Sequence, residues 1–249
     1  LGKGELGVII SPTGTGKSHV LVHLGAQAIK EGKTIIHYTF ELGDTMIAKR
    51  YDSCLTGVPL SDLNTFKEQI LEEVQKLDGR LIVKEYPTKS ASTMALRSHL
   101  EKLKGRDIDV GMIVVDYADL IKPKRFSSEK RHDLESIYEE LRAIAQEFEC
   151  PVWTASQTNR SGYNAEIVTM ESISEAFNKC FVADFIFSIS RTIEDKQNNQ
   201  GKLFIAKNRN GPDGMVYPIF MDTSNVQIKI LPKTPMPTTV NSVVTSPLT

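Results

Sequence analysis

The chain has 249 residues, of which 40% are hydrophobic and 24% are charged, and its formal net charge at pH 7 is -1. This length and composition suit one large α/β domain with a sizeable buried core rather than two small domains. A chain without net positive charge can offer nucleic acid only a local basic patch. No apolar run approaches the roughly 18 residues of a membrane span and no signal peptide opens the chain, so we expect a cytoplasmic protein without a membrane partner.

The predicted strands are short, β-branched and apolar runs. They cover residues 7–10, 34–40, 80–85, 112–116, 152–156, 185–190, 203–207, 216–220 and 226–230. Apolar residues at helical spacing predict helices around residues 21–28, 70–77, 96–103 and 134–148. The last of these has a charged opposite face and is typical of a helix that packs on a core.

The order of these elements predicts the fold class. Strands and helices alternate up to about Gln157, which favours right-handed βαβ units and a mostly parallel central sheet flanked by helices. After Phe185 no further helix is predicted, and the closely spaced strands indicate antiparallel hairpins added at the C-terminal edge. We expect one α/β domain over residues 1–231. Residues 232–249, rich in Pro, Thr, Ser and Val, are predicted to form an extended or mobile tail.

The cysteines and histidines give little sign of a metal site. The three cysteines, Cys54, Cys150 and Cys180, lie far apart without a CxxC pair. This argues against a zinc site or a disulfide framework and favours a reducing compartment, with the cysteines buried as small apolar residues. The five histidines show no ligand spacing and are predicted to be structural.

A phosphate-binding loop is the strongest local motif. A loop of this kind needs small residues that turn consecutive backbone N–H groups inward, a lysine for the β- and γ-phosphates, and a hydroxyl for Mg²⁺. A predicted strand precedes the segment and an amphipathic helix follows it, so we expect a nucleotide there. The candidate residues are Ser11, Pro12, Thr13, Gly14, Thr15, Gly16, Lys17 and Ser18, with Ser11 in place of the usual first glycine.

Three polar residues follow other predicted strands. Glu41, Asp116 and Gln157 all fall at the carboxyl ends of strands, where an open parallel sheet binds its ligand. Asp116 after an apolar strand suits a holder of Mg²⁺, Glu41 a base that polarises the attacking water, and Gln157 a sensor of the γ-phosphate. Taken singly, each could be a helix cap or a solvated strand end. Together they favour hydrolysis over storage of the nucleotide.

Five segments carry a resemblance to a known family. SPTGTGKS, YTFELG, MIVVDYADLI, TASQTNRSG and IAKNRNGPDG occur in the order and approximate spacing of the C-terminal RecA-like motor domain of DnaB-type replicative DNA helicases, bacterial or phage. The similarity covers about residues 2–230. KNRNGP is its most specific element, because general RecA-like ATPases share the P-loop and the acidic strand end but not this run. Asn208 stands where the family often has Gln.

The resemblance implies a RecA-like P-loop NTPase that uses ATP and Mg²⁺ and forms a homo-oligomer, a hexameric ring. It implies 5′ to 3′ translocation on single-stranded DNA, with a primase or a loader as further partners. Carried over by position, Lys17 and Ser18 bind phosphates and Mg²⁺, Glu41 is the catalytic base, Asp116 the second Mg²⁺ residue and Gln157 the coupling sensor. Lys207 and Arg209 would reach the γ-phosphate held by a neighbouring subunit.

The candidate DNA contacts are two segments that follow Asp116 and Gln157 and leave the sheet on the ligand side. Basic residues of the first could follow a phosphate backbone without recognising bases, although an ordinary solvated loop has the same composition. The second segment carries the weaker pattern. The candidates are Lys122, Lys124, Arg125, Lys130 and Arg131 in the first segment and Arg160 in the second.

Two alternatives to a helicase stay open on the sequence. A RecA- or KaiC-like ATPase would form filaments or rings without unwinding DNA, and the run KNRNGP argues against it. A nucleotide-gated assembly scaffold would bind ATP without turnover, and Glu41 argues against that function.

Overall fold

The computed structural model describes residues 1–124, 130–158 and 180–232. Within these ranges the strands are β1 (Leu6–Ser11), β2 (Thr34–Thr39), β3 (Arg80–Glu85), β4 (Met112–Asp116), β5 (Val152–Gln157), β6 (Phe185–Ser190), β7 (Gln200–Asn208), β8 (Val216–Asp222) and β9 (Gln227–Ile230). They form one sheet in the order β3-β2-β4-β5-β1-β6-β7-β8-β9. The α/β fold with a mostly parallel sheet is therefore confirmed.

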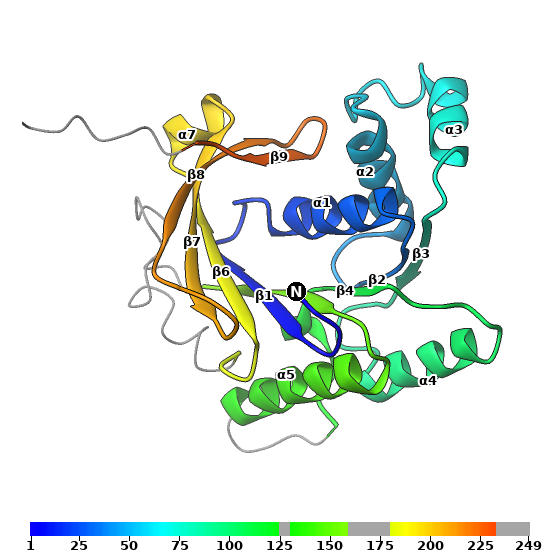
Figure 1. Ribbon diagram of the computed structural model, residues 1–249, viewed down its shortest axis with the longest axis vertical. Coiled ribbons are helices and arrows are strands. Elements are labelled where there is room, and N and C mark those ends of the chain that lie inside the picture. The colour runs from blue at the N-terminus through cyan, green and yellow to red at the C-terminus, as the bar shows by residue number, and fades with distance from the viewer. Residues whose placement is uncertain (125–129, 159–179, 233–249) are drawn as a thin grey trace, which may run out of the picture.

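Helices cover both faces of the parallel part of the sheet (Figure 1). The helices are α1 (Lys17–Lys30), α2 (Asp44–Thr56), α3 (Lys67–Gln75), α4 (Thr93–Lys104), η1 (Ala118–Leu120), α5 (Lys130–Glu147) and α7 (Ile193–Gln197). The sheet separates two hydrophobic clusters, one that α1 and α2 cover and one that α4 and α5 cover. Alternate residues of β1 divide between them, Val8 on the α5 side and Ile9 on the α1 side, as the two-residue period of a strand requires.

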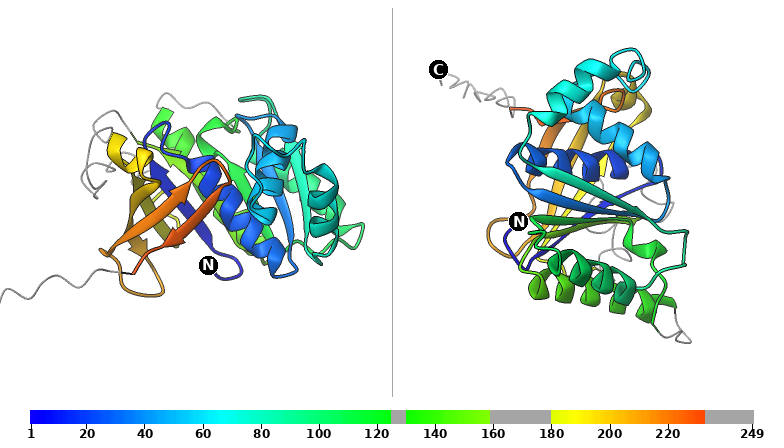
Figure 2. Two further views of the ribbon diagram at one scale, coloured as in Figure 1. Left: turned by 90° about the horizontal axis from the view of Figure 1, so that it is seen from above. Right: turned by 90° about the vertical axis from the view of Figure 1, so that its right-hand side faces the viewer.

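Strand β6 agrees with the prediction on one side only. It pairs antiparallel with β7, as expected, but on its other side it pairs in parallel with β1, from Gly7 opposite Phe185 to Ile10 opposite Ser188. Five of its six residues are buried, as expected for a strand inside the sheet. The antiparallel additions begin one strand later, with β7, β8 and β9. This part of the sheet curls over α1 (Figure 2), where the ring of His23 lies 3.3 Å from the carbonyl oxygen of Val226.

Two α-helices in the described part of the chain were not predicted. The expectation that no helix follows Phe185 is wrong, because α7 is a short helix with a capping box: the Thr192 side chain accepts from the N–H of Asp195, and the Asp195 carboxylate accepts from the N–H of Thr192. Helix α2 buries Ile47, Tyr51 and Cys54. These residues follow helical spacing, but a tyrosine and a cysteine give a weak apolar signal.

The end of the described chain leaves one prediction open. The last strand, β9, ends at Ile230, and residues 233–249 of the predicted tail lie outside the described residues. The boundary after residue 231 therefore stays a prediction. Across the described ranges, no helix combines the length and apolar character needed to cross a bilayer.

Candidate nucleotide-binding site

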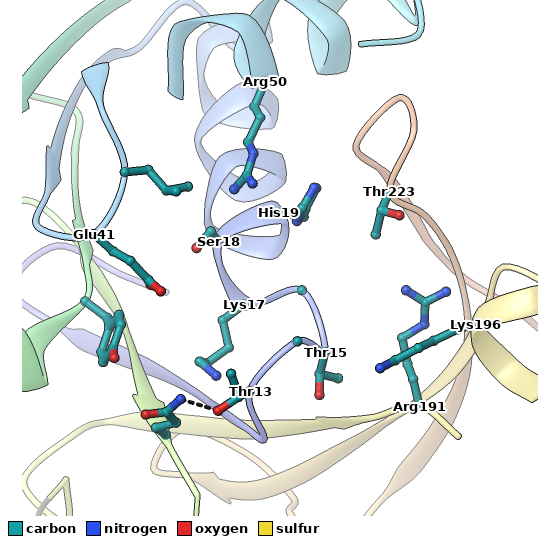
Figure 3. A pocket seen from close by; sticks show the side chains of 15 residues that line it. Thr13, Thr15, Lys17, Ser18, His19, Glu41, Arg50, Arg191, Lys196 and Thr223 are labelled. Carbon is teal, nitrogen blue, oxygen red and sulfur yellow. Dashed lines mark hydrogen bonds between the residues drawn. The ribbon is translucent and has the colours of Figure 1, made fainter. Parts of the chain in front are cut away.

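The parallel strands bring the predicted site residues to one edge of the sheet. Ser11 at the end of β1 lies opposite Gln157 on β5, and Thr39 at the end of β2 lies opposite Asp116 on β4. A pocket of about 410 Å³ opens there (Figure 3). Its lining is Thr13, Gly14, Thr15, Gly16, Lys17, Ser18, His19, Glu41, Leu42, Arg50, Tyr117, Gln157, Arg191, Lys196 and Thr223.

The loop between β1 and α1 has the backbone that the motif predicts. Gly14 and Gly16 have φ angles of 72° and 106°, in the left-handed region that favours glycine. A Cβ on Gly16 would also lie 2.3 Å from the Met221 methyl carbon, so the Met221 side chain would have to shift to admit one. Ser11 is still part of β1 and needs no left-handed backbone. This explains why a serine is tolerated at this position.

Lys17 fills the cradle of the loop. Its ammonium group donates to the carbonyl oxygens of Ser11 and Pro12, both at 3.0 Å. These bonds hold the lysine inside the curve that the loop makes, and its side chain is almost wholly buried. A phosphate entering the cradle would meet this charge together with the backbone N–H groups of the first turn of α1.

Asp116 is a buried carboxylate with unmet bonding capacity. Its residue is 0% exposed, and neither oxygen has a hydrogen bond of ordinary geometry from the described residues, although the Ser18 hydroxyl lies close enough to favour the charged form. Burial raises its pKa to about 6, against the opposing charges of Arg50 and Lys17. Two oxygen groups beside a phosphate cradle fit Mg²⁺, which usually takes one or two protein oxygens and completes its shell with phosphates and water. No larger cluster of metal-binding side chains occurs in the described residues.

The raised pKa of Asp116 predicts a stability that falls as pH rises. Below pH 4 the carboxyl is protonated in both states, whereas above pH 6 the folded protein must keep a buried charge, so the free energy of unfolding drops between these values. At pH 8 without nucleotide, the free energy of unfolding of Asp116→Asn should therefore be about 3 kcal/mol higher than that of the wild type. It should match the wild type at pH 4. Chemical denaturation of both proteins across this range tests this, and an equal difference at every pH would contradict it.

The loop that carries Glu41 is fixed from both sides. The N–H of Phe40 donates to the carbonyl oxygen of Asp116 at 2.8 Å, and the hydroxyl of Thr88 donates to the carbonyl oxygen of Phe40 at 2.8 Å. The Thr39 hydroxyl donates to the carbonyl oxygen of Leu42 at 2.7 Å and closes the turn. Glu41 itself is exposed and lines the pocket. A carboxylate held on a fixed turn beside open space can accept a proton from a water molecule.

Gln157 contacts the phosphate-binding loop directly. Its side-chain amide donates to the hydroxyl of Thr13 (Figure 3, dashed line). Its backbone N–H points at the carboxylate of Asp119 in η1, at 3.4 Å, and the hydroxyl of Tyr138 on α5 donates to the same carboxylate at 2.8 Å. Gln157 thus stands between the loop that would hold the nucleotide and the segment that follows β4.

Arg50 is a site residue that the sequence interpretation missed. It extends from α2 toward Ser18 and Lys17 (Figure 3). Its Nε and Nη1 atoms are buried and have no hydrogen-bond partner among the described residues. Burial lowers its pKa, while Asp116 and Glu41 oppose that shift. A guanidinium with these two nitrogens unbonded, aimed into the pocket, suits a phosphate oxygen. It could have been found only by recognising the weak apolar stripe of α2.

The sequence interpretation also missed the residues on the far side of the pocket. Arg191, Lys196 and Thr223 come from the β6–α7 region and the turn after β8, and they lie across the loop from Glu41 (Figure 3). The Arg191 guanidinium is fixed by the carbonyl oxygens of Gln200, at 2.8 Å, and Met221, at 3.1 Å. No local motif marks these residues, because only the curled sheet brings them near the loop.

The pocket is electrostatically suited to a polyphosphate. Lys17, Arg50, Arg191 and Lys196 face it from four separate segments. Burial lowers the pKa of His19 to about 4, and the charges of Arg50 and Arg191 add to this shift. The histidine is therefore neutral at physiological pH, and the arginines and lysines supply the charge.

Lys207 and Arg209 lie at the opposite edge of the sheet. Asn208 pairs with Phe185 at the start of β6, and Phe185 in turn pairs with Gly7 near the start of β1. The phosphate-binding loop follows the other end of β1. Within one chain these two residues therefore cannot contact a nucleotide in the pocket.

The DNA candidates are only partly described. Lys122 and Lys124 lie on the segment that follows β4, whose end is at the pocket. Lys122 is exposed, and Lys124 forms a 2.8 Å ion pair with Glu140 of α5. Lys130 and Arg131 are the first residues of α5. Arg125 and Arg160 lie outside the described residues.

Comparison with known proteins assigns the family. The model of the DnaB-like helicase C terminal domain matches residues 1–226. A DnaB-like replicative helicase of Enterobacteria phage T4 is 31% identical over a 220-residue alignment, which covers 84% of this chain and 46% of the phage protein. The chain spans about half the length of the curated relatives it matches.

Solved structures agree on the fold. One ATPase domain superposes with a TM-score of 0.78 at 15% identity and covers 93% of this chain and 86% of its own. A DnaB-like replicative helicase, whose interactions with primase were described with its structure, gives a TM-score of 0.77 at 15% identity and covers 91% of this chain and 57% of its own. With its RecA-like fold, its phosphate-binding loop and the family match over residues 1–226, the chain belongs to the DnaB-like helicase C-terminal domain family.

Proposed function

We propose that the chain is the ATP-hydrolysing motor of a replicative DNA helicase, coupling hydrolysis to 5′ to 3′ movement on single-stranded DNA. One observation carries the hydrolytic part. Residues from four strand ends converge on one pocket. There Lys17 fills a phosphate cradle, both oxygens of the buried Asp116 carboxylate lack a hydrogen bond of ordinary geometry from the described residues, and Glu41 lies beside open space. Membership in the helicase family supports the remainder of the proposal.

The residues divide the chemistry between them. Lys17 and the N–H groups of the loop bind the β- and γ-phosphates, and Arg50 adds a second cation. Ser18 and Asp116 would hold Mg²⁺, which neutralises charge on the phosphates when it is bound. Glu41 takes the proton of the attacking water, and its fixed turn aims it. Gln157, bonded to Thr13, senses whether the γ-phosphate is present.

The neighbouring subunit completes the site in this proposal. Because Lys207 and Arg209 lie at the edge opposite the pocket, they can serve only a nucleotide bound by another copy. A head-to-tail interface repeated around a closed ring satisfies this requirement at every site, and we propose a hexamer. The three cysteines are buried thiols, as a reducing compartment allows, so we propose the cytoplasm as the location.

A primase or a loader is proposed as a further partner. The support is a structural neighbour whose description includes its interactions with primase. Pull-down of a candidate primase from the same replication system would test this.

The segment after β4 is proposed to follow the DNA backbone. Replacing Lys122 and Lys124 with Ala should weaken single-strand binding at every sequence tested and make its salt dependence shallower by about one unit per lost phosphate contact. Basal ATP hydrolysis should persist. Lys104→Ala, an exposed lysine at the end of α4, is the matched control. Fluorescence anisotropy over a salt series measures the slope, and an unchanged slope returns the segment to an ordinary solvated loop.

The direct test of the function is ATP hydrolysis with and without single-stranded DNA, with mass photometry in a non-hydrolysable nucleotide. A helicase motor should hydrolyse faster on DNA, assemble into rings and displace a strand. Rings or filaments without strand displacement would favour a RecA- or KaiC-like ATPase. Nucleotide binding with no phosphate release would favour a scaffold.

A further inference from the structure

Asp184 is a heavily bonded buried charge outside the nucleotide pocket. Its side chain is 3% exposed. One carboxylate oxygen accepts from the backbone N–H of Leu6 at 3.0 Å and from Nε of Arg142 at 3.0 Å. The other accepts from Nη2 of Arg142 at 3.1 Å and lies 3.2 Å from Nη1 of Arg209. One carboxylate thus ties together β1, α5 and the turn after β7.

The backbone of the same residue also holds Arg209. The N–H of Arg209 donates to the carbonyl oxygen of Asp184 at 2.9 Å. Lys207 is held by the same short segment, because its ammonium donates to the carbonyl oxygen of Phe181 at 2.6 Å and lies 4.3 Å from the centre of the Phe181 ring. Both residues of the edge opposite the pocket are therefore anchored to residues 181–184.

Asp184 does not need the contact with Arg209 to compensate its buried charge. Arg142 forms a two-pronged pair with the carboxylate and Leu6 adds a third bond, so the charge is already compensated. Although burial opposes it, hydrogen bonding to Arg142 holds the pKa of Asp184 below its ordinary value, with help from Leu6 and Arg209. Meanwhile the Arg209 side chain is 48% exposed while one of its nitrogens stays bound to a buried anchor.

We propose that Asp184 is a positioning residue that presents the Arg209 guanidinium to the nucleotide of a neighbouring copy. This inference rests on the proposed role of Arg209. A free arginine on a turn samples many rotamers, and fixing it before the reaction avoids that entropic cost at the moment of phosphoryl transfer. Losing the anchor should leave nucleotide binding intact and lower kcat about 10- to 100-fold, the effect of misplacing a reacting group by about 1 Å.

Mixing experiments test whether Asp184 acts together with Arg209 on a neighbouring copy. Three proteins with lowered turnover are prepared: Asp184→Asn, Arg209→Ala and Glu41→Gln. The first two should lack only the contribution to a neighbour, and the third should lack only the reaction in its own pocket. Asp184→Asn mixed with Glu41→Gln should therefore regain activity, and Asp184→Asn mixed with Arg209→Ala should not. Recovery in the second mixture overturns the positioning role.

A double-mutant cycle separates positioning from a loss of folding. If Asp184 acts through Arg209, the double variant should have the same kcat as Arg209→Ala alone, whereas an additive loss overturns the proposal. Nucleotide affinity is measured for each protein. Should Asp184→Asn bind nucleotide poorly, Asp184→Glu, which keeps the charge but moves it by one methylene, enters the same cycle.

Arg142→Gln is the matched control. It removes the other guanidinium from the same carboxylate but leaves the contact with Arg209. Mixed with Arg209→Ala, it should therefore still supply Arg209 to the pockets of the Arg209→Ala copies and restore their hydrolysis by complementation. Loss of that complementation would mean that any damage around Asp184 suffices, and would overturn the proposal. The trans role of Arg209 is tested separately by mixing Arg209→Ala with Glu41→Gln. No recovery there overturns the role of Arg209, and with it the inference, whereas recovery there alone leaves only Asp184 at issue.

Discussion

Glu41→Gln is expected to bind ATP almost as tightly as the wild type while its turnover falls by about 10² to 10⁴-fold, the usual contribution of a general base. The amide keeps the shape of the side chain on a turn that Thr39 and Leu42 fix, so the pocket should not rearrange. Only the ability to accept a proton is lost. The measurements are steady-state phosphate release and nucleotide affinity by titration with a fluorescent analogue.

Lys17→Ala should instead weaken the binding of the nucleotide. The lysine fills the phosphate cradle, and removing a charge-assisted bond of about 1.5 to 3 kcal/mol should weaken nucleotide affinity about 10- to 100-fold. Glu31→Gln, an exposed acid at the far end of α1, serves as the control that leaves both quantities unchanged. If Glu41→Gln lost as much nucleotide affinity as Lys17→Ala, Glu41 would be a structural residue of the pocket instead of the base.

The parts of the site that the sequence predicts are those with a local cause. The phosphate-binding loop needs glycines at fixed positions, and Gly14 and Gly16 do have left-handed backbones. The residues at the strand ends follow from the parallel sheet, because parallel register places Ser11 beside Gln157 and Thr39 beside Asp116. The predicted bounds of β3, β4 and β6 are also confirmed to the residue, because each strand is an apolar or β-branched run with polar or turn residues at its ends.

What the sequence does not predict depends on contacts between distant segments. Arg191 reaches the pocket only because the carbonyl oxygens of Gln200 and Met221, on β7 and β8, hold its guanidinium. The parallel pairing of β6 was missed because a buried strand has the same composition whether its neighbour runs parallel or antiparallel. Helix α7 spans five residues, too few to show an apolar period, and only its capping box distinguishes it from a turn.

Mixing Arg209→Ala with Glu41→Gln is expected to restore activity that neither protein has alone. Alone, Arg209→Ala should lose about a thousandfold or more in rate for want of an arginine supplied in trans. Glu41→Gln alone should lose about 10² to 10⁴-fold for want of a base. In a mixture, some interfaces pair the intact Glu41 of one copy with the intact Arg209 of the next. At equal amounts, random assembly makes about one interface in four competent, so recovery should approach a quarter of the wild-type rate if the sites act independently.

The geometry leaves no other way for Arg209 to act on the phosphates. It follows β7 at the edge where β1 begins, whereas the cradle follows the end of β1, so the two lie at opposite edges of one subunit. Hydrolysis per subunit should therefore fall on dilution to monomer. Arg209→Lys, which keeps the charge but loses the planar donors, should stay well below the wild type. A rate per subunit that is constant down to monomer concentrations, with no recovery at any ratio of freely exchanging variants, would mean that Arg209 does not act across an interface.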